Sequence, residues 1–202
     1  MITILGHDTG VTNGCVAVVS FRPNPKNKNL PWQFNIRTLK ILPNTLSDMK
    51  SDQTGQLKKY VSDVMEIFNK YSVDHLVAER FMIRSFRTAT AEYICVMLGA
   101  LDNEMRWRKK KPPVFIPAVT WKNAVNRLFN LKDFYKQVHA LPHECDSVLM
   151  AFHQAGCLDL LATEKARKEL QWKLEQKTSR PAKRVAKKKP VKKAAKKKSV
   201  KK

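Results

Sequence analysis

The sequence predicts an α/β fold in which three antiparallel strands are followed by parallel strands, giving a mixed five-stranded sheet with helices on its faces. Two observations support this prediction. Short β-rich runs separated by turn residues fill the first 42 residues, and helical patterns then alternate with short apolar runs. Hydrophobic residues make up 43% of the 202 residues, which is enough to form a core, and no internal repeat is visible.

The first three strands are expected near the N-terminus. Residues 1–8 and 15–21 are β-rich and flank a Gly-containing turn, which is typical of a hairpin. A third strand is expected over residues 34–42. Residues 22–32 contain three prolines and show no periodicity, so we expect an exposed loop there.

Helices and strands alternate in the middle of the chain. Residues 54–71 place apolar side chains at helical spacing, and residues 73–79 return to a β-rich apolar run. A long helix is expected over residues 88–107, ended by a basic run and two prolines, and a short strand over residues 114–116 follows it. This order predicts parallel strands after the antiparallel ones.

Helices are expected through the rest of the folded chain. Thr120 is predicted to cap a helix that ends near residue 129, and a second helix is expected over residues 131–140. Residues 144–161 are apolar enough to form a helix that packs on the sheet. Residues 162–176 are rich in Glu, Lys, Leu and Ala, as in an amphipathic terminal helix.

The positive charge is concentrated at the C-terminus. The chain holds 39 Lys and Arg against 17 Asp and Glu, a net charge of +22, and 13 of the basic residues lie in residues 178–202. We therefore divide the chain into a folded domain over residues 1–161, an amphipathic helix over residues 162–177 and a lysine-rich tail over residues 178–202. The tail has little apolar surface to bury, so it is expected to be disordered when free.

The charge balance also predicts a nucleic-acid partner. Without the tail, 26 basic residues still face 17 acidic ones, so the folded part is basic by itself. The tail is expected to bind nucleic acid without reading its sequence, with Lys187, Lys188 and Lys189 among the contacts. A solubilising tail, a nuclear-import signal and a patch for anionic membranes are alternative interpretations.

The cysteines and the N-terminus predict a soluble protein of a reducing compartment. Cys15, Cys95, Cys145 and Cys157 form no Cys-x-x-Cys pair, which argues against a disulfide framework and a cysteine-based zinc site. We expect all four to be small buried hydrophobic residues. No long apolar run and no signal-peptide pattern occur, so an intracellular, DNA-associated location is expected.

Acidic residues at the ends of predicted elements suggest a metal-dependent nuclease. Asp8 ends the first strand, Glu79 ends the fourth, and Asp146 lies in the first turn of a late helix with His143 three residues before it. Two carboxylates 4 Å apart repel by about 4 kcal/mol at an effective dielectric near 20, so such a cluster favours a divalent cation. Mg²⁺ and Mn²⁺ prefer oxygen-rich sites, and paired ions of this kind catalyse phosphoryl displacement.

Each of these residues also has a purely structural interpretation. Asp8 can bond within its own turn, and Glu79 can form a surface ion pair with Arg80. Asp146 can complement a helix N-terminus, and a lone His143 is more often structural than a ligand.

Three sequence segments resemble the signature segments of the RuvC family of Holliday-junction resolvases. They read ILGHDTGVTNGCVAVV, DHLVAERFMIRSFRTATAEYICVMLGAL and LPHECDSVLMAFHQAG. The resemblance covers residues 1–160 and implies a ribonuclease H-like fold. It places the family's catalytic, metal-binding residues at Asp8, Glu79, His143 and Asp146.

The resemblance also implies an activity and a set of DNA contacts. Members of the family are homodimers that nick opposed strands of a four-way junction, with two Mg²⁺ per active site and water as the nucleophile. By this resemblance Asp8 bridges the metals, Mn²⁺ also supports activity, and His143 completes a metal shell or assists the water or the leaving group. The family's junction-binding lysines match Lys122 and Lys132, and its aromatic residue matches Phe81 or Phe86. Arg84 and Arg87 are further expected DNA contacts, and the alternative interpretation is that these residues are ordinary solvated charges and core rings.

Some features depart from the family pattern and leave other functions open. Thr9 replaces the usual Pro, and His7 replaces an apolar strand residue. The lysine-rich tail is not a family feature, and it favours a phage or viral relative or a lineage-specific addition. A flap or branch endonuclease and a ribonuclease H use the same fold and metal chemistry. An actin-like ATPase matches only the DTGVT turn, and a non-catalytic histone-like DNA-binding protein needs only the tail.

Overall fold

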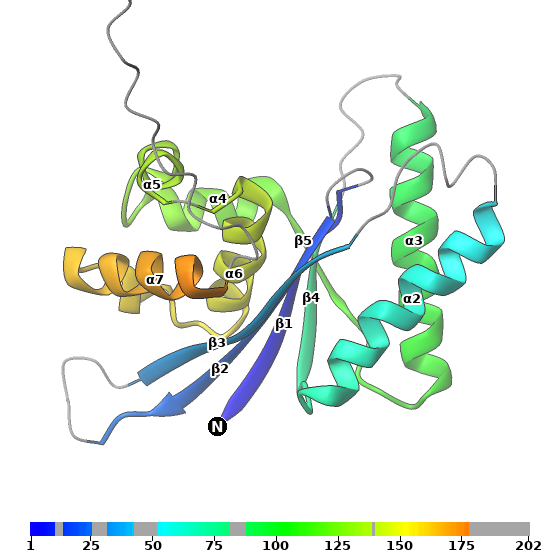
Figure 1. Ribbon diagram of the computed structural model, residues 1–202, viewed down its shortest axis with the longest axis horizontal. Coiled ribbons are helices and arrows are strands. Elements are labelled where there is room, and N and C mark those ends of the chain that lie inside the picture. Colours follow the sequence, from blue (N-terminus) through cyan, green and yellow to red (C-terminus); the bar gives the residue numbers. More distant parts are fainter. Residues whose placement is uncertain (11–13, 26–31, 43–51, 81–87, 139, 178–202) are drawn as a thin grey trace, which may run out of the picture.

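The protein is described by a computed structural model that covers residues 1–10, 14–25, 32–42, 52–80, 88–138 and 140–177. Five strands form one sheet in the order β3-β2-β1-β4-β5 (Figure 1). The strands are β1 Ile2–Asp8, β2 Gly14–Pro23, β3 Trp32–Leu42, β4 His75–Arg80 and β5 Val114–Pro117. β1, β2 and β3 pair antiparallel, and β1, β4 and β5 pair parallel, which confirms the predicted mixed sheet.

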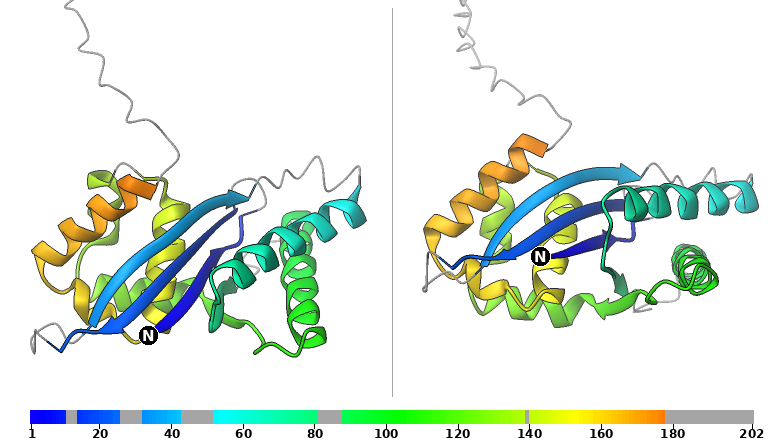
Figure 2. Two further views of the ribbon diagram at one scale, coloured as in Figure 1. Left: turned by 60° about the horizontal axis from the view of Figure 1, so that its bottom comes forward. Right: turned by 90° about the horizontal axis from the view of Figure 1, so that it is seen from below.

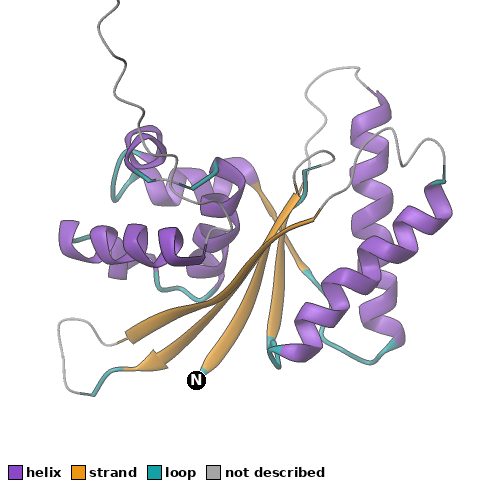
Figure 3. Ribbon diagram, viewed as in Figure 1, coloured by secondary structure: helices purple, strands orange, loops and turns teal. Residues whose placement is uncertain are grey.

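Helices cover both faces of this sheet (Figures 2 and 3). Helices α2 and α3 lie on one face, and helices α4 to α7 lie on the other. The helices are α2 Gln53–Lys70, α3 Thr88–Trp107, α4 Ala118–Asn126, α5 Leu131–Gln137, α6 Pro142–Gln154, a 3₁₀ helix η1 Leu158–Leu161, and α7 Glu164–Lys177. None of the described helices is long and apolar enough to cross a membrane.

The core is divided by the sheet into two apolar clusters because strand side chains alternate between the faces. The first cluster lies under α6 and α7, where Phe21 and Phe34 each stack edge-on against Phe152. The second lies under α2 and α3, where Val18 and Tyr60 are fully buried. The sheet is therefore held by apolar packing against helices on both of its faces.

Several predicted boundaries were wrong, each for a local reason. The helix predicted over residues 144–161 is α6 followed by η1, because Gly156 adopts a left-handed φ of 64° and ends the α-helix. Thr120 is not an N-cap, since α4 begins at Ala118 directly after Pro117. The helix predicted over residues 131–140 ends at Gln137.

Two other predictions fail in part. The loop predicted over residues 22–32 is shortened at both ends, because β2 extends to Pro23 and β3 begins at Trp32. Cys95 is exposed on α3, whereas the other three cysteines are buried as expected. The tail of residues 178–202 lies outside the described residues.

Helix α6 approaches β1 closely at Gly6. A Cβ atom on Gly6 would lie 1.9 Å from the backbone oxygen of Ser147, a distance that no side chain can occupy. The Ser147 hydroxyl donates to the carbonyl oxygens of Cys15 in β2, at 2.9 Å, and of His143 in α6, at 2.8 Å. Glycine in β1 and serine in α6 thus fix the helix against two strands.

The variant Gly6→Ala tests this contact. We expect overpacking against the α6 backbone to lower the free energy of unfolding by about 1 to 3 kcal/mol or more, measured by urea denaturation. Gly99→Ala is the control, because nothing lies within 4 Å of a Cβ at Gly99 in α3. That variant should be unchanged or stabilised by up to about 1 kcal/mol, and equal effects at both glycines would contradict the close approach.

Candidate active site

Asp8 and Glu79 lie side by side at one edge of the sheet. Strands β1 and β4 run parallel with His7 opposite Ala78, and each acidic residue follows directly. The carboxyl ends of parallel strands meet at the same edge, so the two carboxylates are neighbours. The Thr9 hydroxyl donates to the Glu79 carbonyl oxygen at 3.2 Å and ties the two strand ends together.

Helix α6 adds the other two predicted residues to this edge. His143 and Asp146 are three positions apart, and thus on one face of the helix. His143 Nδ1 lies 2.5 Å from Asp8 Oδ2. The hydrogen bond to Asp8 raises the pKa of His143, although partial burial opposes it, so the imidazole is favoured in its protonated form.

Lys122 of α4 lies among the carboxylates. Its Nζ is 3.1 Å from Asp146 Oδ2 and 3.9 Å from Glu79 Oε2. Burial alone would lower the pKa of Lys122, but the charges of Asp146 and Glu79 outweigh it and raise the pKa. Lys122 is therefore a fixed positive charge inside the cluster.

Two further residues complete the cluster. The Trp121 indole N–H donates to Glu79 Oε2 at 3.3 Å, and its side chain is fully buried. The Tyr135 hydroxyl of α5 donates to Asp146 Oδ1. Sequence analysis missed both residues because their helical spacing indicates only packing, and no signal pairs Tyr135 with Asp146.

Burial dominates the electrostatics of the acidic residues. It raises the pKa of Glu79 and of Asp146, and Lys122 opposes the rise at both residues. Among the described residues, three carboxylates are thus balanced by one lysine and one protonatable histidine. The alternative interpretation of Glu79 as a partner of Arg80 is not supported, because its described ion pair is with Lys122.

Most of the groups that could bind a metal here are carboxylate oxygens, which hard divalent cations prefer. Within the described ranges, however, no three acidic, histidine or cysteine side chains are grouped as ready ligands of one ion. The ammonium of Lys122 and the Asp8–His143 hydrogen bond occupy oxygens that an ion would need. An ion could therefore bind here only if these contacts rearranged.

Two of the nine residues predicted to contact DNA lie within the described residues. Lys122 lies within the carboxylate cluster, and Lys132 is exposed in the first turn of α5. The remaining candidates lie outside the described residues: Phe81, Arg84, Phe86, Arg87, Lys187, Lys188 and Lys189.

Replacing the internal lysine tests the charge balance. Lys122→Met should lower the free energy of unfolding at pH 7 by about 1 to 2 kcal/mol. This is less than the loss expected for a fully buried ion pair, because the Lys122 side chain is 35% exposed. The loss should shrink as the pH falls, since Asp146 and Glu79 have raised pKa values in the folded state and take up protons there. Urea unfolding at several pH values measures it.

The control is Lys136→Met, which removes an exposed lysine paired with Asp133, whose side chains are 77% and 54% exposed. Its effect should stay below about 0.5 kcal/mol at every pH. A loss in Lys122→Met that does not depend on pH would contradict the proposed balance.

Comparison with known proteins supports the fold. No protein-family model and no curated protein sequence matches the chain. Among solved structures, Thermus thermophilus RuvC in complex with a Holliday junction substrate matches with a TM-score of 0.59 at 12% identity, covering 77% of this chain and 98% of that chain. A Thermus thermophilus RuvC structure also matches with a TM-score of 0.59, at 13% identity and the same coverage. The chain therefore has the ribonuclease H-like fold of RuvC, as its three sequence segments predict.

Proposed function

We propose that the protein is a structure-specific endodeoxyribonuclease that resolves four-way DNA junctions. The observation that carries this proposal is the meeting of Asp8, Glu79, His143 and Asp146 at one edge of a RuvC-like sheet. The net charge of +22 favours a polyanionic substrate. One of the similar structures is a complex with a Holliday junction substrate, which supports branched DNA as the substrate here.

Asp8, Glu79, Asp146 and His143 would hold two Mg²⁺ ions, with Mn²⁺ as an effective replacement. When bound, such ions stabilise the attacking and leaving oxygens of phosphodiester hydrolysis. The protein's own contribution is to concentrate carboxylate oxygens at the end of a rigid sheet. Burial of Asp146, which is 6% exposed, keeps water from competing for its oxygens.

His143 and Lys122 add proton and charge chemistry. The His143 side chain is 44% exposed, so a substrate can reach the ring while Nδ1 remains bonded to Asp8. As the alternative to holding an ion, which needs a neutral ring, the protonated ring can give a proton to the leaving oxygen. The ammonium of Lys122 faces the same edge and can attract the scissile phosphate.

Two opposed nicks in one junction require two active sites, and we propose that a homodimer supplies them. Tyr93, Val96, Met97 and Ala100 lie at helical spacing along one stripe of α3. Met97 is buried in the protein's own core, whereas the other three are partly exposed. The neighbouring Gly99 has open space around it, so a second helix can approach this side of α3.

The competing functions differ in their products. A flap or branch endonuclease or a ribonuclease H would cut other substrates with the same chemistry, whereas a resolvase leaves paired, symmetric nicks in a junction. An actin-like ATPase needs two lobes, and the described residues form one sheet. A histone-like protein would bind DNA without cutting it.

The variant Asp8→Asn separates these possibilities. With Mg²⁺, the wild-type protein should nick junctions in preference to flaps and RNA–DNA hybrids. Asp8→Asn should cut at less than about one thousandth of that rate, equivalent to about 4 kcal/mol in the barrier, because an essential oxygen ligand is removed. Junction binding should persist or tighten, since repulsion of phosphate is relieved. Gel assays of cleavage and binding measure both.

Asp133→Asn is the matched control, because Asp133 is 54% exposed and pairs only with nearby Lys136 among the described side chains. It should cleave at the wild-type rate. Metal-dependent cutting by Asp8→Asn at a comparable rate would refute the assignment, and equal cutting of flaps by the wild type would favour the branch endonuclease.

Deleting residues 178–202 tests the tail. Each phosphate neutralised by a tail lysine adds about 0.9 to the slope of log affinity against log salt, so the deletion should weaken binding and flatten this slope. The preference for junctions over linear duplex should remain, because contacts between lysines and phosphates do not distinguish the two kinds of DNA. An unchanged slope, or the disappearance of the preference, would contradict the division between the tail and the folded domain.

A further inference from the structure

Along β2, the face of the sheet under α2 and α3 changes from apolar to polar. Val16 and Val18 on this face are fully buried in the apolar cluster. The next residues on the same face, Ser20 and Arg22, are polar, and Arg22 is exposed. This half of the face lies at the end of the sheet far from Asp8, because Asp8 pairs with Cys15 at the opposite end of β2.

Strand β3 continues this polar surface. Gln33 and Asn35 lie opposite Arg22 and Ser20 in the strand register, and both are exposed. A bulge leaves Arg37 without a register partner, and its side chain is also exposed. The polar side chains thus lie on two paired strands, whose backbone holds them at fixed spacing.

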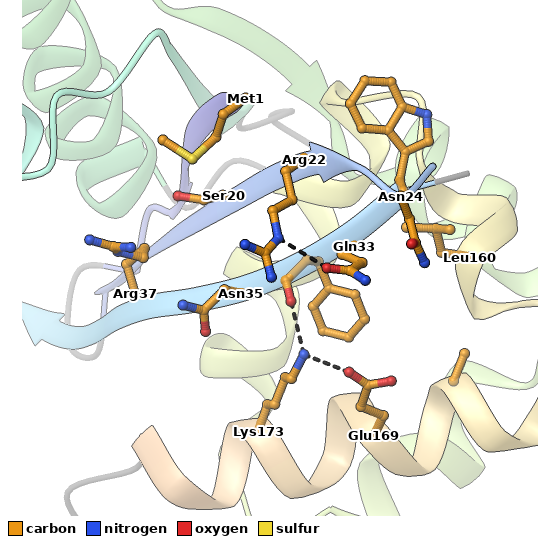
Figure 4. Close-up of a pocket in the computed structure, with 13 residues that line it drawn as sticks. Met1, Ser20, Arg22, Asn24, Gln33, Asn35, Arg37, Leu160, Glu169 and Lys173 are labelled. Atoms are coloured by element: carbon orange, nitrogen blue, oxygen red, sulfur yellow. Dashed lines mark hydrogen bonds and ion pairs between the residues drawn. The ribbon is translucent and has the colours of Figure 1, made fainter. Parts of the chain in front are cut away.

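A pocket of about 430 Å³ lies at the β3 edge of the sheet, where these polar side chains line it from one face and residues of α7 line it from the other (Figure 4). Arg22 Nε donates to Gln33 Oε1 at 3.0 Å, which holds the guanidinium over the strands. The exposed fraction of Trp32, which also lines the pocket, is 37%. The pocket therefore joins an oriented cation to an accessible aromatic ring.

The charges in this pocket are unevenly balanced. Its carboxylate, Glu169, lies 2.6 Å from Lys173 Nζ, and that ammonium also donates to the Phe34 carbonyl oxygen at 2.8 Å. Arg22 and Arg37 have no acidic partner within the described part of the chain. Two guanidinium groups thus remain available to an anion.

We propose that Arg22 and Arg37 bind the phosphate backbone of a DNA arm, as a second DNA contact far from the acidic cluster. This proposal rests on the proposed junction-cleaving function, which supplies the DNA. Guanidinium groups bind phosphate oxygens in a fork geometry, and an exposed indole packs on a sugar or a base. Phosphates carry no sequence information, so this contact positions the arm and does not read it.

The sheet sets the distance between the two contacts. Arg22 lies seven residues along β2 from Cys15, the partner of Asp8. At 3.3 Å per residue the separation is about 23 Å, or about seven base pairs of B-DNA. An arm shorter than this cannot reach the second contact while its branch lies at the acidic cluster.

The experiment compares Arg22→Gln/Arg37→Gln with the wild type in binding junctions, in chelator so that no cleavage occurs. One junction has hairpin-capped arms of about five base pairs, and the other has arms of about twenty. With long arms, the salt slope of the double variant should fall by about 1 for each phosphate that the two arginines neutralise in the wild type. With short arms, the variant and the wild type should bind alike.

Arg106→Gln/Arg108→Gln is the matched control, because it removes the same charge from arginines already paired with Asp102 and Glu104 on α3. A long-arm slope equal to that of this control would overturn the proposal, as would an equal loss of affinity with short arms. Hydroxyl-radical footprinting adds a second measurement, since protection at or beyond about seven base pairs from the branch should disappear in the variant.

Thermal melting verifies that both double variants are folded. The proposal can fail independently of the proposed function, because the wild type is tested separately for cleavage with Mg²⁺. A wild type that cuts junctions while the arm contact is absent would leave the nuclease assignment intact and remove only the second site.

Discussion

The close approach of α6 to β1 is the constraint on which the rest of the site depends. Gly6 has no Cβ to separate the helix from the strand, and Ser147 bonds the helix to β2. Only at this separation does His143 reach Asp8. A larger residue at position 6 would displace the whole helix, so one small residue in the middle of a strand determines whether groups 135 positions apart can bond.

Concentrating acidic groups at one edge has a cost that the protein offsets locally. Lys122 and the protonated form of His143 supply positive charge, and Trp121 and Tyr135 donate hydrogen bonds to Glu79 and Asp146. Each of these groups occupies an oxygen that catalysis by metal ions would use. If the protein is the proposed nuclease, this arrangement is a compromise, because the contacts that stabilise the protein without an ion use the same oxygen atoms that would bind one.

The fold and the four central residues were accessible from the sequence, because strand ends and helical spacing are local patterns. Asp8 and Glu79 follow apolar strand runs, and the three-residue spacing of His143 and Asp146 indicates one helix face. Trp121 and Tyr135 were not accessible, because their bonds depend on how three helices pack. The depth of Lys122 was missed for the same reason, since a sequence shows charge but not burial.

Strand β2 links the acidic cluster to the proposed arm contact, and this explains why a polar surface at the far end of the sheet can serve the same substrate. Its first half is buried on both faces, with Val16 and Val18 in one apolar cluster and Ala17 and Val19 in the other. A strand fixed in this way cannot stretch or slide, because a register shift of one residue would exchange its faces. The distance between Cys15 and Arg22 is therefore constant. A duplex arm is also stiff over about seven base pairs, so the two contacts on the protein and the two contacted points on the arm keep fixed distances.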